Sequence, residues 1–155
     1  MAGGNYRRED AGSDAPKIDQ RSWNIGVITA FAEIVGVGVK KLALSGPMTP
    51  EEVSSLWEEA SWIANENQVS LYRESELLVS DLFPADAARG KEVLLIYQGS
   101  TLDEYIVLKR HKAVLVESGA YTGKAREEIA RLFGKLLSYP EPGIDELLKK
   151  NTLRE

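Results

Sequence analysis

The chain has 155 residues, of which 43% are hydrophobic and 28% are charged, and its net charge at pH 7 is −5. This length and composition are typical of one folded globular domain with a core of its own. The negative net charge argues against a nucleic-acid partner, because a surface that binds phosphates must be positive and would be a local exception on an acidic protein. The absence of cysteine excludes disulfides, thiolate nucleophiles and cysteine-ligated metal centres.

The first 22 residues are rich in Gly, Ser, Asp and Asn, carry mixed charges and show no apolar periodicity. We expect a disordered N-terminal tail over residues 1–22 and a single globular domain over residues 23–155. The N-terminus also lacks the basic start and the unbroken apolar core of a secretory signal. The cytoplasm is therefore the expected location.

The most apolar stretch, IGVITAFAEIVGVGV at residues 25–39, predicts a helix over about 24–38. Its polar side chains, Thr29 and Glu33, lie four residues apart and form one narrow stripe. We expect one of its last two glycines to end the helix, although VGVGV can also be extended. A helix that is apolar on most sides must be covered by its own domain or by a second subunit. The stretch is too short and too interrupted to span a membrane.

Residues 39–44 are expected to be an extended connector that ends in a turn containing glycine and proline. The next helix, over about 50–66, has a clear beginning. Thr49 can cap it, a proline follows at the first helical position, and Glu52 completes a capping box.

Three segments rich in Val, Leu, Ile and Tyr predict strands over about 69–73, 77–83 and 92–98. A short Glu-Ser-Glu link joins the first two, which are expected to form an antiparallel pair. The third contains a continuous apolar run at residues 93–96, which is typical of a central strand covered on both faces.

Three helices are expected after the sheet, over about 101–118, 124–139 and 144–150. Thr101 and Glu104 have the spacing of a second capping box. Residues 105–116 hold two apolar runs around a basic cluster, so a strand pair is the competing interpretation. We favour the helix because the cluster lacks the Gly, Asn or Asp that a tight hairpin turn needs.

Together these elements predict an α+β fold with a small, mainly antiparallel three-stranded sheet. Two helices precede the sheet, and the C-terminal helices pack on one face of it. A parallel pairing that involves residues 39–44 would change this arrangement to a three-layer α/β fold.

Sequence signals for catalysis are sparse. There is no phosphate-binding loop, dinucleotide-binding glycine pattern, serine-nucleophile elbow or zinc-protease helix motif. His111 is the only histidine, whereas metal sites built on histidine commonly use two or three. We therefore expect neither a metal nor a cofactor, and we interpret His111 as a solvated surface residue.

One candidate site joins Arg73 and Glu74, at the end of the first expected strand, with Asp81 in the second. Paired carboxylates can act as general acid and general base when burial separates their pKa values. The interpretation that we favour is structural: Glu74 and Glu76 are solvated turn residues, and Arg73 pairs with one of them.

Two weaker candidate sites remain. Ser100 and Thr101 precede an expected helix, where free backbone N–H groups suit a phosphate or carboxylate, although capping explains both hydroxyls equally well. Thr29 and Glu33 lie on the apolar helix and either line a pocket or mark the strip that reaches water. A buried Glu33 would need a partner such as Lys109.

The sequence thus predicts a module that associates with itself or binds a small ligand, most simply as a homodimer, because its apolar faces exceed what one small sheet covers. Trp62 lies outside the apolar stripe of its helix and either contacts another element or belongs to an interface. The alternative is a cofactor-free enzyme acting on an anionic small metabolite. Its anchor would be Arg73 or Lys109, and its base Glu33, Glu74 or Asp81.

Overall fold

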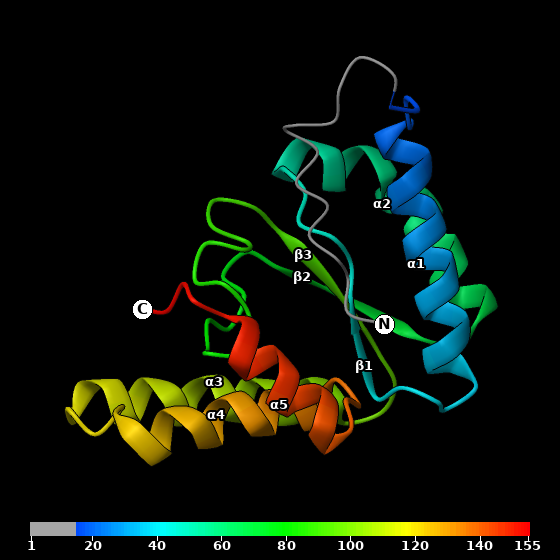
Figure 1. The fold of residues 1–155 in the computed structure, drawn as a ribbon. Coiled ribbons are helices and arrows are strands. Elements are labelled where there is room, and N and C mark those ends of the chain that lie inside the picture. Colours follow the sequence, from blue (N-terminus) through cyan, green and yellow to red (C-terminus); the bar gives the residue numbers. More distant parts are fainter. Residues whose placement is uncertain (1–14) are drawn as a thin grey trace.

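The computed structural model describes residues 15–155 (Figure 1). The first helix, α1 (Gln20–Gly36), begins earlier than predicted, because the Asp19 carboxylate accepts a hydrogen bond from the Ser22 amide at 2.9 Å. The last three residues of the expected tail are thus helical, whereas its first 14 residues lie outside the described part of the chain.

Glycine ends α1, as the sequence predicted. Gly38 has a φ of 82°, and its amide donates to the Val35 carbonyl at 3.0 Å. A left-handed glycine closes the last helical turn in this way at many helix ends. The extended alternative for the VGVGV segment is therefore wrong.

A three-stranded antiparallel sheet confirms the predicted α+β class. Its strands are β1 (Leu42–Leu44), β2 (Ser70–Glu74) and β3 (Val93–Tyr97), in the order β1-β3-β2. The residues of β1 were expected to be a connector. They pair with β3 in the antiparallel sense, with Leu44 opposite Leu95, so the parallel alternative is wrong.

The strand predicted over residues 77–83 is wrong. This segment is irregular because side chains bind its backbone groups: the Leu78 amide donates to the Tyr105 hydroxyl at 3.0 Å, and the Val79 carbonyl accepts from the Lys112 ammonium at 2.8 Å. β2 therefore pairs with β3 instead of forming a hairpin with the residues that follow it.

Helices cover both faces of the sheet. After α1 come α2 (Pro50–Glu66), α3 (Thr101–Glu117), α4 (Gly123–Leu136) and α5 (Glu141–Lys150). Figure 1 shows α1 and α2 on one side of the strands and α3, α4 and α5 together on the other. α4 ends three residues earlier than predicted, because Ser138 has a φ of 64° and turns the chain toward α5.

The two helix beginnings predicted from capping boxes differ in outcome. At α2 the box forms: the Thr49 hydroxyl accepts from the Glu52 amide at 3.2 Å, and the Glu52 carboxylate accepts from the Thr49 amide at 2.8 Å. The box expected at Thr101 and Glu104 is wrong, because Gly99 (φ 57°) turns the chain and Thr101 is already helical. α3 is one continuous helix, so the strand pair over residues 105–116 is also wrong.

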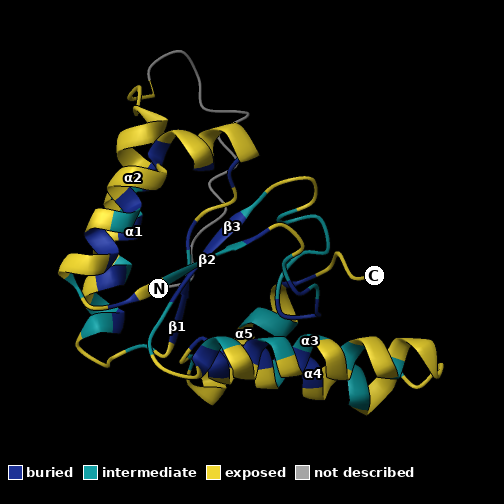
Figure 2. Ribbon diagram, turned by 180° about the vertical axis from the view of Figure 1, so that it is seen from behind, coloured by how far each residue is buried: buried dark blue, intermediate teal, exposed yellow. Residues whose placement is uncertain are grey.

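β3 is the central strand, as predicted, and its side chains enter two separate cores. Leu94 and Ile96 pack in the core beneath α1 and α2, whereas Val93 and Leu95 pack in the core beneath α3, α4 and α5. All four side chains are at most 1% exposed. Figure 2 shows this buried strand in dark blue between two helical layers whose outer surfaces are yellow.

The close approach of α1 and α2 yields a first prediction. A Cβ atom at Gly36 would lie 2.6 Å from the Asn67 carbonyl oxygen, at the end of α2. We expect Gly36→Ala to lower the free energy of unfolding by about 2 kcal/mol, because the two backbones must separate. Gly143→Ala in α5 meets nothing closer than 3.6 Å and should raise that free energy by about 0.5–1 kcal/mol. Urea denaturation measures both, and stabilisation by both variants would contradict the tight contact.

Candidate functional site

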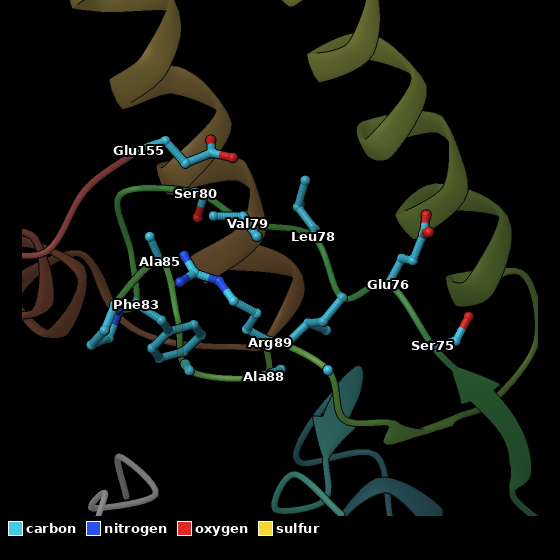
Figure 3. A pocket seen from close by; sticks show the side chains of 14 residues that line it. Ser75, Glu76, Leu78, Val79, Ser80, Phe83, Ala85, Ala88, Arg89 and Glu155 are labelled. Atoms are coloured by element: carbon cyan, nitrogen blue, oxygen red, sulfur yellow. The ribbon is translucent and has the colours of Figure 1, made fainter. Parts of the chain in front are cut away.

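A cavity of about 310 Å³ lies beneath the irregular chain between β2 and β3 (Figure 3). Most of its lining is apolar and includes Leu77, Leu78, Val79, Phe83 and Ala88. Its polar lining residues are Ser75, Glu76, Ser80, Arg89 and Glu155. The cavity exists because residues 77–83 leave the sheet and pack against the helices on the α3 side.

The first anchor of the cavity wall is Glu74, at the end of β2. Its carboxylate is buried and accepts hydrogen bonds from the Lys109 ammonium at 2.9 Å, the Tyr105 hydroxyl at 2.8 Å and the Glu76 amide at 2.9 Å. The Tyr105 hydroxyl in turn accepts from the Leu78 amide. This network fixes the chain to α3 directly after β2.

The second anchor is Asp81, whose carboxylate is also buried. Arg126 of α4 donates to it from Nε at 3.1 Å and from Nη2 at 2.6 Å, which is a bidentate ion pair. The negative charge of Asp81 raises the pKa of Arg126. The Asn151 amide group donates to the carbonyls of Asp81 and Phe83 at 2.9 and 2.8 Å and holds the next part of the wall.

The carboxylates proposed as acid and base are thus already occupied. Glu74 pairs with Lys109 and accepts two further hydrogen bonds, and Asp81 pairs with Arg126, so the solvated turn residue expected at Glu74 is wrong. Lys109 pairs with Glu74 and not with Glu33. Because both oxygens of each carboxylate accept hydrogen bonds, these buried ion pairs position the chain.

Arg73 lies on the opposite face of the sheet from Glu74, because successive strand residues alternate. Arg73 forms an ion pair with Glu92 and donates to the Ser54 hydroxyl at 3.1 Å and the Pro50 carbonyl at 2.8 Å. The expected pairing of Arg73 with Glu74 or Glu76 is therefore wrong, since the hairpin on which it depended does not form.

The other sequence candidates lie apart from the cavity. Thr29 and Glu33 are exposed on α1, where the Thr29 hydroxyl donates to the Ile25 carbonyl at 2.8 Å. Ser100 and Thr101 follow the C-terminal end of β3, whereas Glu74 pairs with its first residue. Among the sequence candidates, the structure thus pairs Glu74 with Lys109. Glu74 and Asp81 anchor the chain that lines the cavity, but none of these three residues lines it.

Arg89 is a candidate binding residue that sequence reasoning missed. Its side chain extends across the cavity toward Val79 and Ala85 (Figure 3). Within residues 15–155, its guanidinium has no hydrogen bond and no ion pair. No motif surrounds Arg89 in the sequence, and its place depends on how the irregular chain folds.

Tyr121 lies close to the charged end of the cavity wall. Two cations lie over its ring: the Lys112 ammonium is 5.0 Å from the ring centroid, and the Arg126 guanidinium is 4.7 Å from it. Burial raises the pKa of Tyr121 to about 12, with the carboxylates of Asp81 and Glu155 adding to the effect and Arg126 opposing it. Its hydroxyl is buried and has no hydrogen-bond partner among the described residues.

A groove of about 300 Å³ between α3 and α4 includes His111, which is exposed as expected. Its lysines are already paired, Lys41 with Glu104 at 3.0 Å and Lys135 with Glu141 at 3.1 Å. The groove therefore offers a ligand less unpaired charge than the cavity does.

The outward face of α1 is a second candidate site, and we call it the outer surface of α1. It consists of apolar residues that are exposed or half-buried: Trp23, Gly26, Val27, Ala30, Ile34 and Val37. Trp23 is 53% exposed and Val37 is 71% exposed. The residues that α1 buries lie on its other side. Trp62 of α2 is also exposed (65%), so no other element of the chain covers most of its side chain.

Among residues 15–155, no group of three or more acidic or histidine side chains is placed to hold a metal ion. In the same part of the chain, no helix combines the length and the apolar content needed to cross a bilayer. Comparison with protein-family models, with curated proteins and with solved structures finds no match.

The two buried tyrosines provide a matched test of the first anchor. Tyr105→Phe removes a hydroxyl that links Glu74 to the Leu78 amide, so we expect the free energy of unfolding to fall by about 1.5–3 kcal/mol. Tyr121→Phe removes a hydroxyl with no partner in the described chain and should change that free energy by about 0.5 kcal/mol or less. Urea denaturation of both variants measures the difference, and equal losses would contradict the proposed anchor.

The raised pKa of Tyr121 predicts a loss of stability at alkaline pH. The pKa of Tyr121 is about 12 in the folded state and about 10 when the chain is unfolded. The unfolded chain therefore loses this proton first, and the free energy of unfolding should fall as the pH rises from about 10 to about 12. Denaturation at about pH 9 and about pH 11 should show a smaller fall for Tyr121→Phe than for the unchanged protein. The same fall in both would assign the effect to other groups.

Proposed function

We propose that this protein is a self-associating module, and that the outer surface of α1 joins two copies into a symmetric homodimer. The observation that carries this proposal is the outer surface of α1, a run of exposed or half-buried apolar residues along the helix, with the exposed Glu33 at its edge. Contiguous apolar surface of this kind on a folded protein commonly marks an interface.

The spacing of the exposed residues suits a helix partner. Trp23, Val27, Ala30, Ile34 and Val37 follow one another at intervals of four, three, four and three residues. This is the repeat that keeps one seam of a helix facing another helix. Gly26 and Ala30 are small, so they let two backbones approach closely in the middle of the seam.

The seam is also complementary to itself, as a two-fold interface requires. In an antiparallel pair centred on Ala30, Trp23 of one copy lies near the partner's Val37, and Gly26 lies near the partner's Ile34. At these two positions a larger side chain meets a smaller one, and at the centre Ala30 meets Ala30 of the partner. The five seam positions carry no charge, and the exposed Glu33 flanks them.

The alternative function, a cofactor-free enzyme, has less support. Glu74 and Asp81 already bind cationic side chains, and Glu33 lies exposed on α1, away from the cavity. For an anionic small molecule as a second partner, the supporting feature is the cavity that Arg89 lines. The cytoplasmic location expected from the sequence stays a prediction.

A charge in the seam tests the proposal. Ala30 is exposed in the single chain, so Ala30→Lys should leave the fold intact and place two like charges together in the dimer. We expect the dimer dissociation constant to rise about a hundredfold or more, since like-charge contacts cost several kcal/mol and 1.4 kcal/mol is a factor of ten. Sedimentation velocity over a range of concentrations measures the change, and circular dichroism checks the fold.

Val114→Lys is the matched control. Val114 is 61% exposed on α3, on the other side of the sheet from α1, so this variant adds the same charge without touching the seam. Its dimer should be as stable as that of the unchanged protein. A protein that is monomeric at every concentration, or a dimer lost only with Val114→Lys, would overturn the proposed interface.

A further inference from the structure

The cavity beneath residues 75–90 has the construction of a small-molecule site. Its volume of about 310 Å³ lies at the lower end of the range of about 300–1,000 Å³ found for ligand pockets. Such pockets combine a mainly apolar lining with a few polar groups that orient the ligand. Here Leu77, Val79 and Phe83 contribute apolar wall, and Arg89 contributes a cation.

Within the described residues 15–155, one cationic side chain that lines the cavity has no ion-pair partner. Lys112 is paired with Glu155 at 2.6 Å, and Lys109 is paired with Glu74 at 2.9 Å. Arg89 has no such partner within residues 15–155, and its guanidinium offers five N–H donors. A planar guanidinium matches a carboxylate, to which it can donate two parallel hydrogen bonds.

The carboxylates that line the cavity limit how much negative charge a ligand can carry. Glu76 and Glu155 also line the cavity, and Figure 3 shows the Glu76 carboxylate directed away from Arg89, toward α3. A ligand with two or more negative charges, such as a phosphate, would be repelled by these carboxylates and would find only one unpaired cation. A single carboxylate avoids most of that repulsion.

We propose that this cavity binds small monocarboxylates with an apolar body. The carboxylate is held by the Arg89 guanidinium, and the apolar body packs against the wall that Phe83 and Leu77 form. The site lies on the α3 side of the sheet, opposite α1, so this inference does not depend on self-association of the protein.

Hexanoate is a suitable probe, and hexan-1-ol is its uncharged match. In ¹H–¹⁵N correlation spectra of the full chain, hexanoate should shift the amides of residues 75–90, with a dissociation constant on the order of 1 mM for a ligand of this size. Hexan-1-ol should bind at least about tenfold more weakly, because it cannot form the charge-assisted bonds to Arg89. Inorganic phosphate should also bind at least about tenfold more weakly than hexanoate.

The variant Arg89→Gln should weaken hexanoate binding about tenfold or more and leave hexan-1-ol binding unchanged. Arg89 is exposed and its guanidinium has no hydrogen bond or ion pair within residues 15–155, so the fold should persist. Arg110→Gln, which removes an exposed arginine from α3, is the control and should leave both affinities unchanged.

Three results would overturn the inference. One is equal affinity for hexanoate and hexan-1-ol, which would leave an apolar cavity without selection for a carboxylate. Another is hexanoate binding that Arg89→Gln does not weaken. The third is the absence of shifts in residues 75–90 at about 100 mM hexanoate, since a built site should be well occupied there. None of these results bears on the dimer, which the sedimentation experiment tests separately.

Discussion

The burial of β3 on both faces is the constraint on which the rest of the structure depends. Val93 and Leu95 point to one side and Leu94 and Ile96 to the other, and all four are almost completely buried. Because a strand with apolar side chains on both faces needs cover on both, α1 and α2 must pack on one side and α3, α4 and α5 on the other. β1 and β2 then occupy the two edges of β3.

Residues 77–83 leave the sheet after β2, and buried polar side chains replace the backbone hydrogen bonds that these residues would make in a strand. Residues 77–83 lose the backbone partners that a strand would supply, and side chains of α3 such as Tyr105 and Lys112 replace them. The ion pairs of Glu74 and Asp81 hold the two ends of this wall. These ion pairs therefore position the wall of the cavity, which lies between the irregular chain and the helices.

The two candidate surfaces lie on opposite sides of the sheet. The outer surface of α1 is apolar and spaced like a helix seam, whereas the cavity combines an apolar wall with Arg89, whose guanidinium has no partner within residues 15–155. Because the sheet separates the two surfaces, the dimer that we propose would leave the cavity accessible. In the function that we propose, association and ligand binding are thus independent properties of the two helical layers.

The sequence alone determined the features that depend on near neighbours along the chain. The capping box at Thr49, the central position of β3 and the apolar excess of α1 all follow from contacts or periodicities within a few residues. Tertiary structure decided what depends on distant residues. The pairing of β1 with β3, the irregular path of residues 77–83 and the partners of Glu74 and Asp81 all involve groups far apart in sequence. The sequence pattern around a residue does not indicate which distant donor binds its backbone groups. These residues are therefore brought together only in the folded chain.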